Sequence, residues 1–441
     1  MANVSDINLY DYIELKVYDI HGYKRGRIIT RSQLPSVFKH GMGLRHGICY
    51  EGMHGPSNQH PFFTGDIKNT NLRMMPLLST LRPSQKSVFG NNKVGSVLCE
   101  LRYPQDMSLD TSAPRETTRT ILQLLQEEFG LHVKSSFEIE FGIKDTRTKK
   151  YLGEGSQWAS LVALETNQDA VVGLLDEMKD MGIKIDTLMC ERGIGQFEYT
   201  LEPTDGIEAA DMLTEFKAAS HLYLKSKGFE GEFMTSNDPN GSIHHGYHFN
   251  FSLWNSDGGN VLVNPDNPQE LSQFGRHWLA GLVEHAPALT ALSSPTVNCY
   301  RRLTSKWSPT FANWTLEHRS SSFRLKMEPG GNVYIENRLP SSACSPHLVL
   351  ASTMAAGVDG VRRQLTLPDP MAQTKRLPAT LEDALEVLEA DTMLKEILGP
   401  KMVELFIFTK RTYEIKHFQS FGNISNEEMF IKEKEYYHDS M

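Results

Sequence analysis

Apolar and polar residues alternate in short runs over the first hundred residues, which predicts β-strands. Residues 13–18 and 24–29 are two such runs, and the turn Asp19-Ile20-His21-Gly22 between them predicts a hairpin. Residues 96–102 alternate in the same way. Residues 40–95 are rich in Gly, His, Pro and Asn and have little periodicity, so we predict an irregular segment. Together these runs predict a small β-rich N-terminal domain over residues 1–108.

The rest of the chain mixes helical and strand periodicities. Spacings of three to four residues predict helices over 115–129, 168–181, 208–227, 268–292, 346–364, 380–397 and 400–416. Alternation predicts strands over 134–143, at both ends of 183–201, and over 247–254, 319–326 and 332–339. The polar tail after Phe418 is expected to pack late or on a neighbouring molecule. The mixture predicts an α+β domain over residues 112–441, with a sheet that has one polar face.

The strand over 134–143 carries the first candidate chemistry. Phe137, Ile139 and Phe141 point to one face, whereas Glu138 and Glu140 point to the other. An ordinary solvated strand face would explain this pair. A binding site for a divalent metal ion would also explain the pair, because carboxylate oxygens are the ligands that Mg²⁺ and Mn²⁺ prefer. The second interpretation needs further ligands elsewhere in the chain.

Glu191 and Glu198 are the next candidate ligands. They flank a turn that contains Gly193 and Gly195, and the glycines permit a tight reversal that would bring both carboxylates to one point. A surface turn is the simpler alternative. On the strand over 247–254, His248 shares one face with an amide and a hydroxyl, which is typical of the wall of a site.

Arginines accompany the later candidate residues. Glu336 and Arg338 share a strand face, while Arg302, Arg319 and Arg324 lie in two nearby polar segments. Each could be a solvated surface charge or an ordinary ion pair. Arginine is also the usual residue for bidentate recognition of carboxylates and phosphates.

Composition narrows the functional classes. The 441-residue chain has a net charge of −9 with scattered Lys and Arg, which argues against a nucleic-acid surface. The five cysteines include no CxxC pair, and the first residues resemble no signal peptide, so we expect a cytoplasmic protein without a membrane partner. Clustered acids repel one another unless cations neutralise them. Acids with arginines therefore predict a metal-bound nucleotide, a carboxylate co-substrate and phosphoryl transfer, without a P-loop or kinase motif.

These segments, in this order, resemble the glutamine synthetase family. The matching segments are 136–141, 191–198, 246–253, 298–302, 319–324 and 336–338. The resemblance implies a β-grasp-like N-terminal domain, a catalytic domain built on a half-barrel of antiparallel strands, and a ring-shaped homo-oligomer, a dodecamer in the family. It also implies a reaction in which ATP phosphorylates the side chain of glutamate and an amine displaces the phosphate.

The resemblance implies roles for individual residues. Two or more Mg²⁺ or Mn²⁺ ions would be held by Glu140, Glu191 and Glu198 and by Glu138, His248 and Glu336. The substrate would be bound by Gly246, Arg302 and Arg338. ATP would be bound by Ser252, Arg319 and Arg324. The catalytic residues would be Glu51, Arg302 and Arg324, with Glu51 aligned only weakly with the family's N-terminal aspartate.

Several positions depart from the family pattern where the amine should bind. The flap over 304–309 lacks the glutamate that closes an ammonium site, and the loop before His248 is longer and bulkier than usual. An amine other than ammonia is therefore expected. Asn298-Cys299, the flap and residues 333–337 look most like lengsin, a family branch without synthetase activity. Two alternatives to a ligase remain. The first is a lengsin-like structural or chaperone-like protein that has lost catalytic activity and has a filament partner. The second is a scaffold that binds ATP without turnover. Retention of all six metal ligands favours the ligase.

Overall fold

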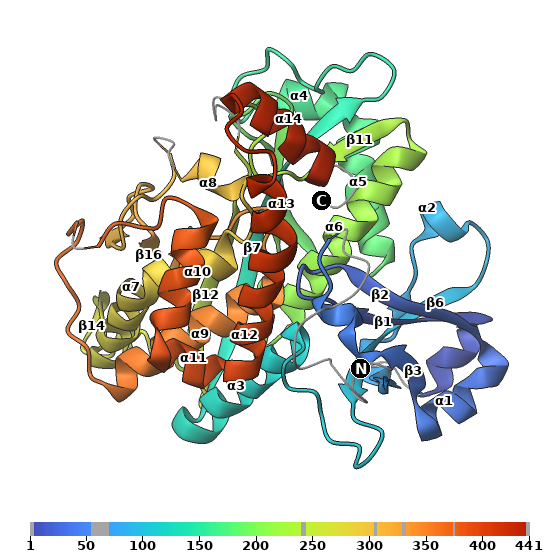
Figure 1. Cartoon of the computed structure of the whole chain (residues 1–441), viewed down its shortest axis with the longest axis horizontal. Helices are drawn as coiled ribbons and strands as arrows, with labels where there is room; N and C mark the ends of the chain where they lie inside the picture. Colours follow the sequence, from blue (N-terminus) through green and yellow to red (C-terminus); the bar gives the residue numbers. More distant parts are fainter. Residues whose placement is uncertain are drawn as a thin grey trace.

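The computed structural model describes residues 4–53, 70–239, 244–303, 307–328, 332–373 and 375–437. Two large β-sheets and the helices packed around them form the molecule, so the predicted α+β class is confirmed (Figure 1). No helix in the described ranges is long and apolar enough to cross a membrane.

The N-terminal sheet has six strands. Its order is β2 (Lys24–Thr30), β1 (Tyr12–Tyr18), β6 (Val94–Arg102), β4 (Asn71–Pro76) and β3 (Met42–Arg45), with β5 (Arg82–Pro83) also paired to β6. β1 and β2 form the predicted antiparallel hairpin, whereas β1 and β6 run parallel.

The irregular segment predicted for residues 40–95 is wrong for its described part. It contains β3, β4, β5 and α2 (Lys86–Phe89), and it follows directly on α1 (Leu34–His40). β3 and β5 have only four and two residues, and β4 is paired with both β3 and β6. Pairing between distant segments leaves no periodic signal in the local sequence. Residues 54–69 lie outside the described residues.

The second sheet has nine strands and carries the candidate site. Its order is β15 (Trp314–Leu316), β16 (Phe323–Met327), β17 (Val333–Asn337), β12 (Tyr247–Asn255), β7 (Leu131–Asp145), β9 (Gln196–Leu201) and β8 (Ile185–Cys190). β10 (Thr204–Asp205) and β11 (Phe229–Glu232) also pair with β7, and β13 (Val263–Asn264) forms a separate hairpin with β14 (Asn267–Leu271).

The two faces of β7 differ as predicted. Phe137, Ile139 and Phe141 have no exposed surface, and the Phe141 ring stacks on Phe233 with centroids 4.6 Å apart. The same ring meets Phe216 of α6 (Glu208–Ser226) edge-on. This apolar packing fixes β7, because a shift of one residue would turn every side chain to the opposite face. Glu138 and Glu140 are thereby held on the other face.

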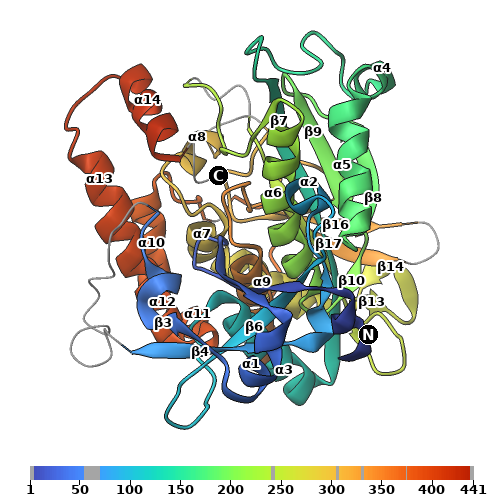
Figure 2. The same cartoon turned by 90° about the vertical axis from the view of Figure 1, so that its right-hand side faces the viewer.

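Helices surround the large sheet. They are α3 (Pro114–Phe129), α4 (Leu161–Thr166), α5 (Gln168–Asp180), α6, α7 (Gln273–Ser293), α8 (Cys299–Arg302), α9 (Pro346–Arg362), α10 (Leu381–Ala390), α11 (Thr392–Leu398), α12 (Pro400–Thr409), α13 (Lys416–Gln419) and α14 (Asn426–Tyr437). α7 and α9 cross closely, since a Cβ at Gly281 would lie 2.2 Å from the Ala356 carbonyl oxygen. Figure 2 shows α13 and α14 on the opposite side of the molecule from α5 and β8.

Three predicted helices have different bounds. The helix expected over 268–292 begins at Gln273, because the preceding residues form β14. The helix expected over 380–397 is interrupted at Asp391, whose side chain caps α11 by accepting a hydrogen bond from the Leu394 amide. The helix expected over 400–416 ends its regular turns at Thr409 and continues as a π-helical segment, Lys410–Ile415.

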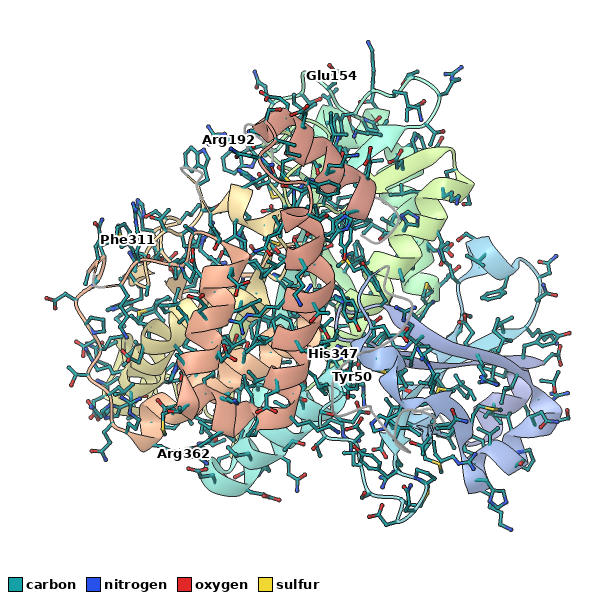
Figure 3. All side chains as sticks on the ribbon, viewed as in Figure 1. Tyr50, Glu154, Arg192, Phe311, His347 and Arg362 are labelled. Atoms are coloured by element: carbon teal, nitrogen blue, oxygen red, sulfur yellow. The ribbon has the colours of Figure 1, made fainter. Side chains whose placement is uncertain are left out.

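Buried polar contacts join the N-terminal sheet to the helices. Tyr18 of β1 donates a hydrogen bond to Glu215 of α6, and Lys16 pairs with the same carboxylate at 2.6 Å. Beside them, Asp211 accepts hydrogen bonds from Arg115 at 2.9 Å and pairs with His347 at 2.8 Å. Figure 3 shows His347 near this junction. The N-terminal sheet is therefore fixed against the helices that carry the large sheet.

Candidate metal and nucleotide site

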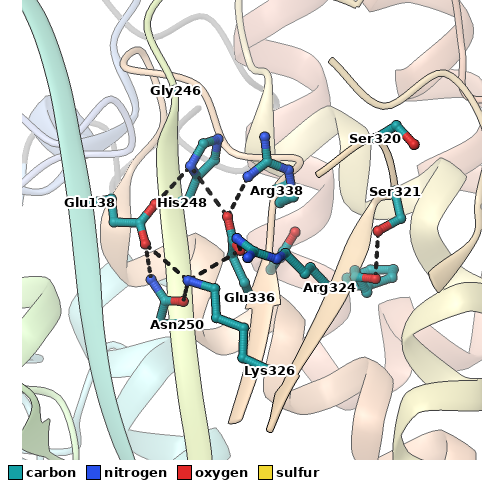
Figure 4. A network of polar contacts seen from close by, with 12 residues as sticks. Glu138, Gly246, His248, Asn250, Ser320, Ser321, Arg324, Lys326, Glu336 and Arg338 are labelled. Atoms are coloured by element: carbon teal, nitrogen blue, oxygen red, sulfur yellow. Dashed lines mark hydrogen bonds and ion pairs between the residues drawn. The ribbon is translucent and has the colours of Figure 1, made fainter. Parts of the chain in front are cut away.

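Three neighbouring strands bring Glu138, His248 and Glu336 together. His248 of β12 lies opposite Glu138 of β7, and Asn250, two residues further on, lies opposite Glu336 of β17. One ligand atom from each of Glu138, His248 and Glu336 lies within 4.8 Å of the others. His248 Nδ1 is 3.0 Å from Glu138 Oε2 and 3.5 Å from Glu336 Oε1 (Figure 4). The structure thus brings one of the two predicted ligand sets to metal-binding distance.

Cationic side chains crowd the same two carboxylates. Arg338 pairs with Glu336 Oε1, and Arg324 Nη1 is 3.2 Å from Glu336 Oε2. Lys326 Nζ lies 3.3 Å from both Glu138 Oε1 and Glu336 Oε2. The predicted substrate residue Arg338 and the predicted nucleotide residue Arg324 therefore both border the three-ligand group.

The charges in this group set its protonation states. Burial alone would raise the pKa of Glu138, but the hydrogen bond with His248 and the charge of Lys326 hold it below its usual value. Burial also raises the pKa of Glu336, and Arg338 and Lys326 reverse that effect. Burial and Arg338 lower the pKa of His248. Carboxylates with lowered pKa values and an imidazole with a lowered pKa are the kinds of group that suit a divalent metal ion.

The second predicted ligand set is more loosely arranged. Glu140 lies opposite Glu198 across β7 and β9, and its carboxylate accepts hydrogen bonds from the Gly246 amide at 2.7 Å and from Gln196. Among the described residues, Glu140, Glu191 and Glu198 form no second three-ligand group. Burial and the Glu191 charge raise the pKa of Glu140 to about 8, while burial and the neighbouring carboxylates raise that of Glu198 to about 9. A bound cation would relieve this repulsion.

The predicted substrate residues Arg302 and Gly246 lie beside this group. Arg302 is buried and donates hydrogen bonds to the carbonyl oxygens of Arg338 at 2.9 Å and Leu339 at 3.1 Å. Burial lowers the pKa of Arg302 to about 10. A Cβ at Gly246 would lie 2.9 Å from His248 Nε2 and 3.1 Å from Arg302 Nη2. Glycine is therefore required where the backbone passes between the histidine and the arginine.

A cavity of about 580 Å³ opens beside the three-ligand group. Glu138 and Asn250 line its inner end, and Ser252, Trp254 and Tyr334 line the part further along the strands. Ser252 accepts a hydrogen bond from the Trp254 indole at 2.9 Å. The predicted ATP residue Ser252 thus lines a space large enough for a small-molecule ligand.

Two predicted residues lie elsewhere. Glu51 lies between β3 and β4 of the N-terminal sheet, where it pairs with Arg45 while its carbonyl oxygen is 2.9 Å from His21 Nε2. Arg319 is exposed in the turn before β16, not on that strand, and it forms no ion pair within the described ranges. An alternating pattern extended back from β16 placed Arg319 on the strand, but β16 begins only at Phe323. The structure does not join either residue to the three-ligand group.

Sequence reasoning missed Lys326 and the C-terminal helix. Lys326 is two residues after Arg324 and shares its strand face, a signal that was available. Glu433 of α14 is buried and accepts hydrogen bonds from Arg301 Nε and Nη2, both at 2.8 Å, and from Asn298 at 2.8 Å. The polar tail therefore packs on its own chain, against the segment that ends in Arg302. No local pattern indicates this long-range contact.

The comparisons with known proteins agree with this geometry. Residues 111–429 match the family model for the glutamine synthetase catalytic domain. The chain is 28% identical over 435 residues to a glutamine synthetase of Methanococcus voltae, with 92% of each chain covered. It is also 28% identical over 384 residues to a glutamate–isopropylamine ligase of a Pseudomonas species, with 82% of each covered.

Two further comparisons concern the branch of the family to which the chain belongs and the fold of the chain. The chain is 27% identical over 435 residues to lengsin of Homo sapiens, covering 93% of this chain and 81% of lengsin. Such similar identities do not single out the lengsin branch. A crystal structure of a glutamine synthase homologue superimposes with a TM-score of 0.84 at 24% identity, covering 97% of this chain and 99% of that chain. This superposition supports the fold.

Proposed function

Because the chain belongs to the glutamine synthetase family, we propose that it is an ATP-dependent ligase that joins the side-chain carboxylate of glutamate to an amine. The observation that carries the proposal is the three-ligand group Glu138, His248 and Glu336, bordered by Arg324 and Arg338 and open to a cavity. Buried acids and arginines at one point suit the handling of a metal-bound polyphosphate beside a carboxylate.

The metal ion is proposed to be Mg²⁺ or Mn²⁺, held by Glu138, His248 and Glu336. When bound, it would neutralise phosphate charge during transfer. The nucleotide is proposed to occupy the cavity lined by Ser252 and Tyr334, with its phosphates directed towards Arg324. In this arrangement the chain itself supplies orientation and positive charge, which are the main contributions that proteins make to phosphoryl transfer.

Glutamate is proposed to bind between Arg302 and Arg338. Both guanidinium groups are buried beside the three-ligand group, and Arg302 has nitrogen donors beyond those used on the two carbonyl oxygens. In the proposed reaction, a carboxylate oxygen of glutamate takes the γ-phosphoryl group from ATP, and ADP leaves. The amine nitrogen then attacks the acyl carbon, and phosphate leaves. Glu140, Glu191 and Glu198 are proposed to hold a second divalent cation, as the family resemblance implies, because a cation would relieve the repulsion that raises their pKa values.

The acceptor is proposed to be an amine with an apolar body. Trp158 is 57% exposed and donates a hydrogen bond to Glu191 Oε1 at 3.2 Å. Trp307 is 60% exposed, and its ring lies 4.5 Å from the Arg192 guanidinium. Arg192 lies at the outer edge of the molecule (Figure 3). Two indoles at the Glu191–Arg192 turn therefore offer apolar surface beside the acidic group, which suits an alkyl or arylalkyl ammonium ion better than ammonium itself.

Replacing Trp158 is expected to change the choice of amine. In Trp158→Ala, kcat/KM for an arylalkyl amine should fall by about 10-fold, the effect of losing one aromatic contact, while the KM for ATP stays unchanged. Steady-state phosphate release with a series of amines would measure this. Trp254→Phe, on the nucleotide side, is the contrasting variant and should alter the KM for ATP but not the order of amines. If Trp158→Ala leaves the order of preference among the amines unchanged, Trp158 is not part of the acceptor site.

A screen for amine-dependent phosphate release tests the function as a whole. Purified protein with Mg²⁺, ATP and glutamate should release phosphate when an amine is added, and mass spectrometry should detect the γ-glutamyl amide. Binding of ATP without release in the presence of any amine would favour the scaffold interpretation. Absence of both binding and release would favour the lengsin-like structural protein.

A further inference from the structure

A lysine stands where the predicted metal ligands face each other. Lys326 Nζ lies 3.3 Å from Glu138 Oε1 and 3.3 Å from Glu336 Oε2, so one ammonium group bridges both carboxylates (Figure 4). His248 approaches the other oxygen of each carboxylate, Glu138 Oε2 and Glu336 Oε1. The imidazole and the ammonium thus contact different oxygens of the same two acids.

The position of Lys326 is determined by packing as well as by charge. Its strand, β16, pairs with β17 so that Lys326 lies opposite Tyr334, and the ammonium group is 5.2 Å from the centre of that ring. The ammonium group also lies 3.4 Å from Asn250 Oδ1. Its side chain is only 14% exposed, and that of Glu336 is 1% exposed. Little water is available to screen this ion pair, so its charge acts strongly on anything else that binds there.

The negative charges of Glu138 and Glu336 are already offset by neighbouring cations without a metal ion. Glu138 and Glu336 carry two negative charges, and Lys326, Arg324 and Arg338 all lie within ion-pair distance of Glu336. A divalent cation that bound the same carboxylates would approach three positive charges. The two arginines are also expected to serve substrate and nucleotide, whereas the flexible four-carbon stem of lysine can withdraw its single charge.

We propose that Lys326 is a built-in counter-ion that competes with the divalent metal ion for Glu138 and Glu336. In the absence of nucleotide it keeps the affinity for metal low. Asn250 and Tyr334, which contact Lys326, also line the cavity, so a polyanion bound there can take up the ammonium group and leave the carboxylates free. Metal and nucleotide binding are then positively coupled. This inference rests on the proposed metal site but concerns a residue outside the predicted ligand sets.

Titration with Mn²⁺ in the absence of nucleotide tests the competition, with free Mn²⁺ followed by electron paramagnetic resonance. Lys326→Met should bind Mn²⁺ at least about 10-fold more tightly than the unaltered protein, because it lacks an opposing charge a few ångströms from the ligands. Lys326→Arg keeps the charge and should bind no more tightly than the unaltered protein. Lys375→Met removes a lysine from an exposed ion pair with Glu284 and is the matched control.

A second measurement tests the coupling. A non-hydrolysable ATP analogue should tighten Mn²⁺ binding in the unaltered protein and should do so several-fold less in Lys326→Met. Lys326→Gln, which keeps a polar side chain, provides the same comparison if the Met variant does not fold. Equal or weaker Mn²⁺ affinity in both neutral variants would overturn the inference, and Mn²⁺ binding by none of the proteins would overturn it as well.

These outcomes are separable from the proposed reaction. Amine-dependent phosphate release together with unchanged Mn²⁺ affinity in Lys326→Met would remove the counter-ion role and leave the ligase proposal intact. Tighter Mn²⁺ binding in Lys326→Met without phosphate release under any condition would support the counter-ion and contradict the ligase.

Discussion

Glu336→Gln is expected to lower amine-dependent phosphate release by about 10³-fold, the loss that corresponds to several kcal/mol of transition-state stabilisation by a metal ion. Glu336 is the acid on which the site converges, because its carboxylate meets Arg324, Lys326 and Arg338 and lies 3.5 Å from His248. The amide keeps the shape of the side chain but removes a charged ligand. Arg324 and Lys326 then keep only Glu317 and Glu138, respectively, as acidic partners.

Stopped-time assays of phosphate release and Mn²⁺ titration would measure this effect in parallel. Glu127→Gln, the same substitution on the exposed face of α3, serves as the control and should leave both measurements unchanged. A Glu336→Gln protein that folds normally and retains more than about a tenth of the activity would show that this carboxylate does not hold an essential metal ion.

Glu433→Ala is expected to cost about 3 kcal/mol of unfolding free energy, because it removes the carboxylate that neutralises the largely buried Arg301. Glu433 accepts two hydrogen bonds from Arg301 and one from Asn298, and it is the main polar link between α14 and the segment that ends in Arg302. Loosening this segment should also raise the KM for glutamate by about 10-fold, since Arg302 is proposed to bind it.

Urea unfolding and steady-state kinetics would measure the two effects of Glu433→Ala. Glu435→Ala is a suitable control on the same helix, because Glu435 forms an exposed ion pair with Lys432 and should contribute less than about 0.5 kcal/mol. If the KM for glutamate is unchanged while stability falls, Glu433 fastens α14 without positioning Arg302.

The central part of the site was accessible from the sequence because strands impose a strict alternation. Glu138 and His248 lie on faces that their own strands define, and the register between β7 and β12 places them opposite each other. The resemblance to the glutamine synthetase family then identified Glu336 as the third ligand. Alternation does not reveal which strands are neighbours in the sheet. A solvated strand face therefore remained an alternative explanation for Glu138.

Other features depend on contacts between distant segments. The pairing of β4 with β6 creates strands in a region without periodicity, and the burial of Glu433 depends on α14 folding back over more than a hundred residues. Arg319 shows the opposite error, because a strand pattern was extended past the residue where the strand begins. The strand alternation that places Arg324 on the polar face also places Lys326 there. Lysine is not a usual metal ligand, so a search for metal ligands does not select it.

Amine-dependent phosphate release by the purified protein tests the central claim most directly. With Mg²⁺, ATP, glutamate and an alkyl or arylalkyl amine, we predict stoichiometric formation of ADP, phosphate and a γ-glutamyl amide, and loss of all three products in Glu336→Gln. Absence of products with every amine in a screen that includes ammonium, alkyl amines, arylalkyl amines and polyamines would contradict the proposed ligase.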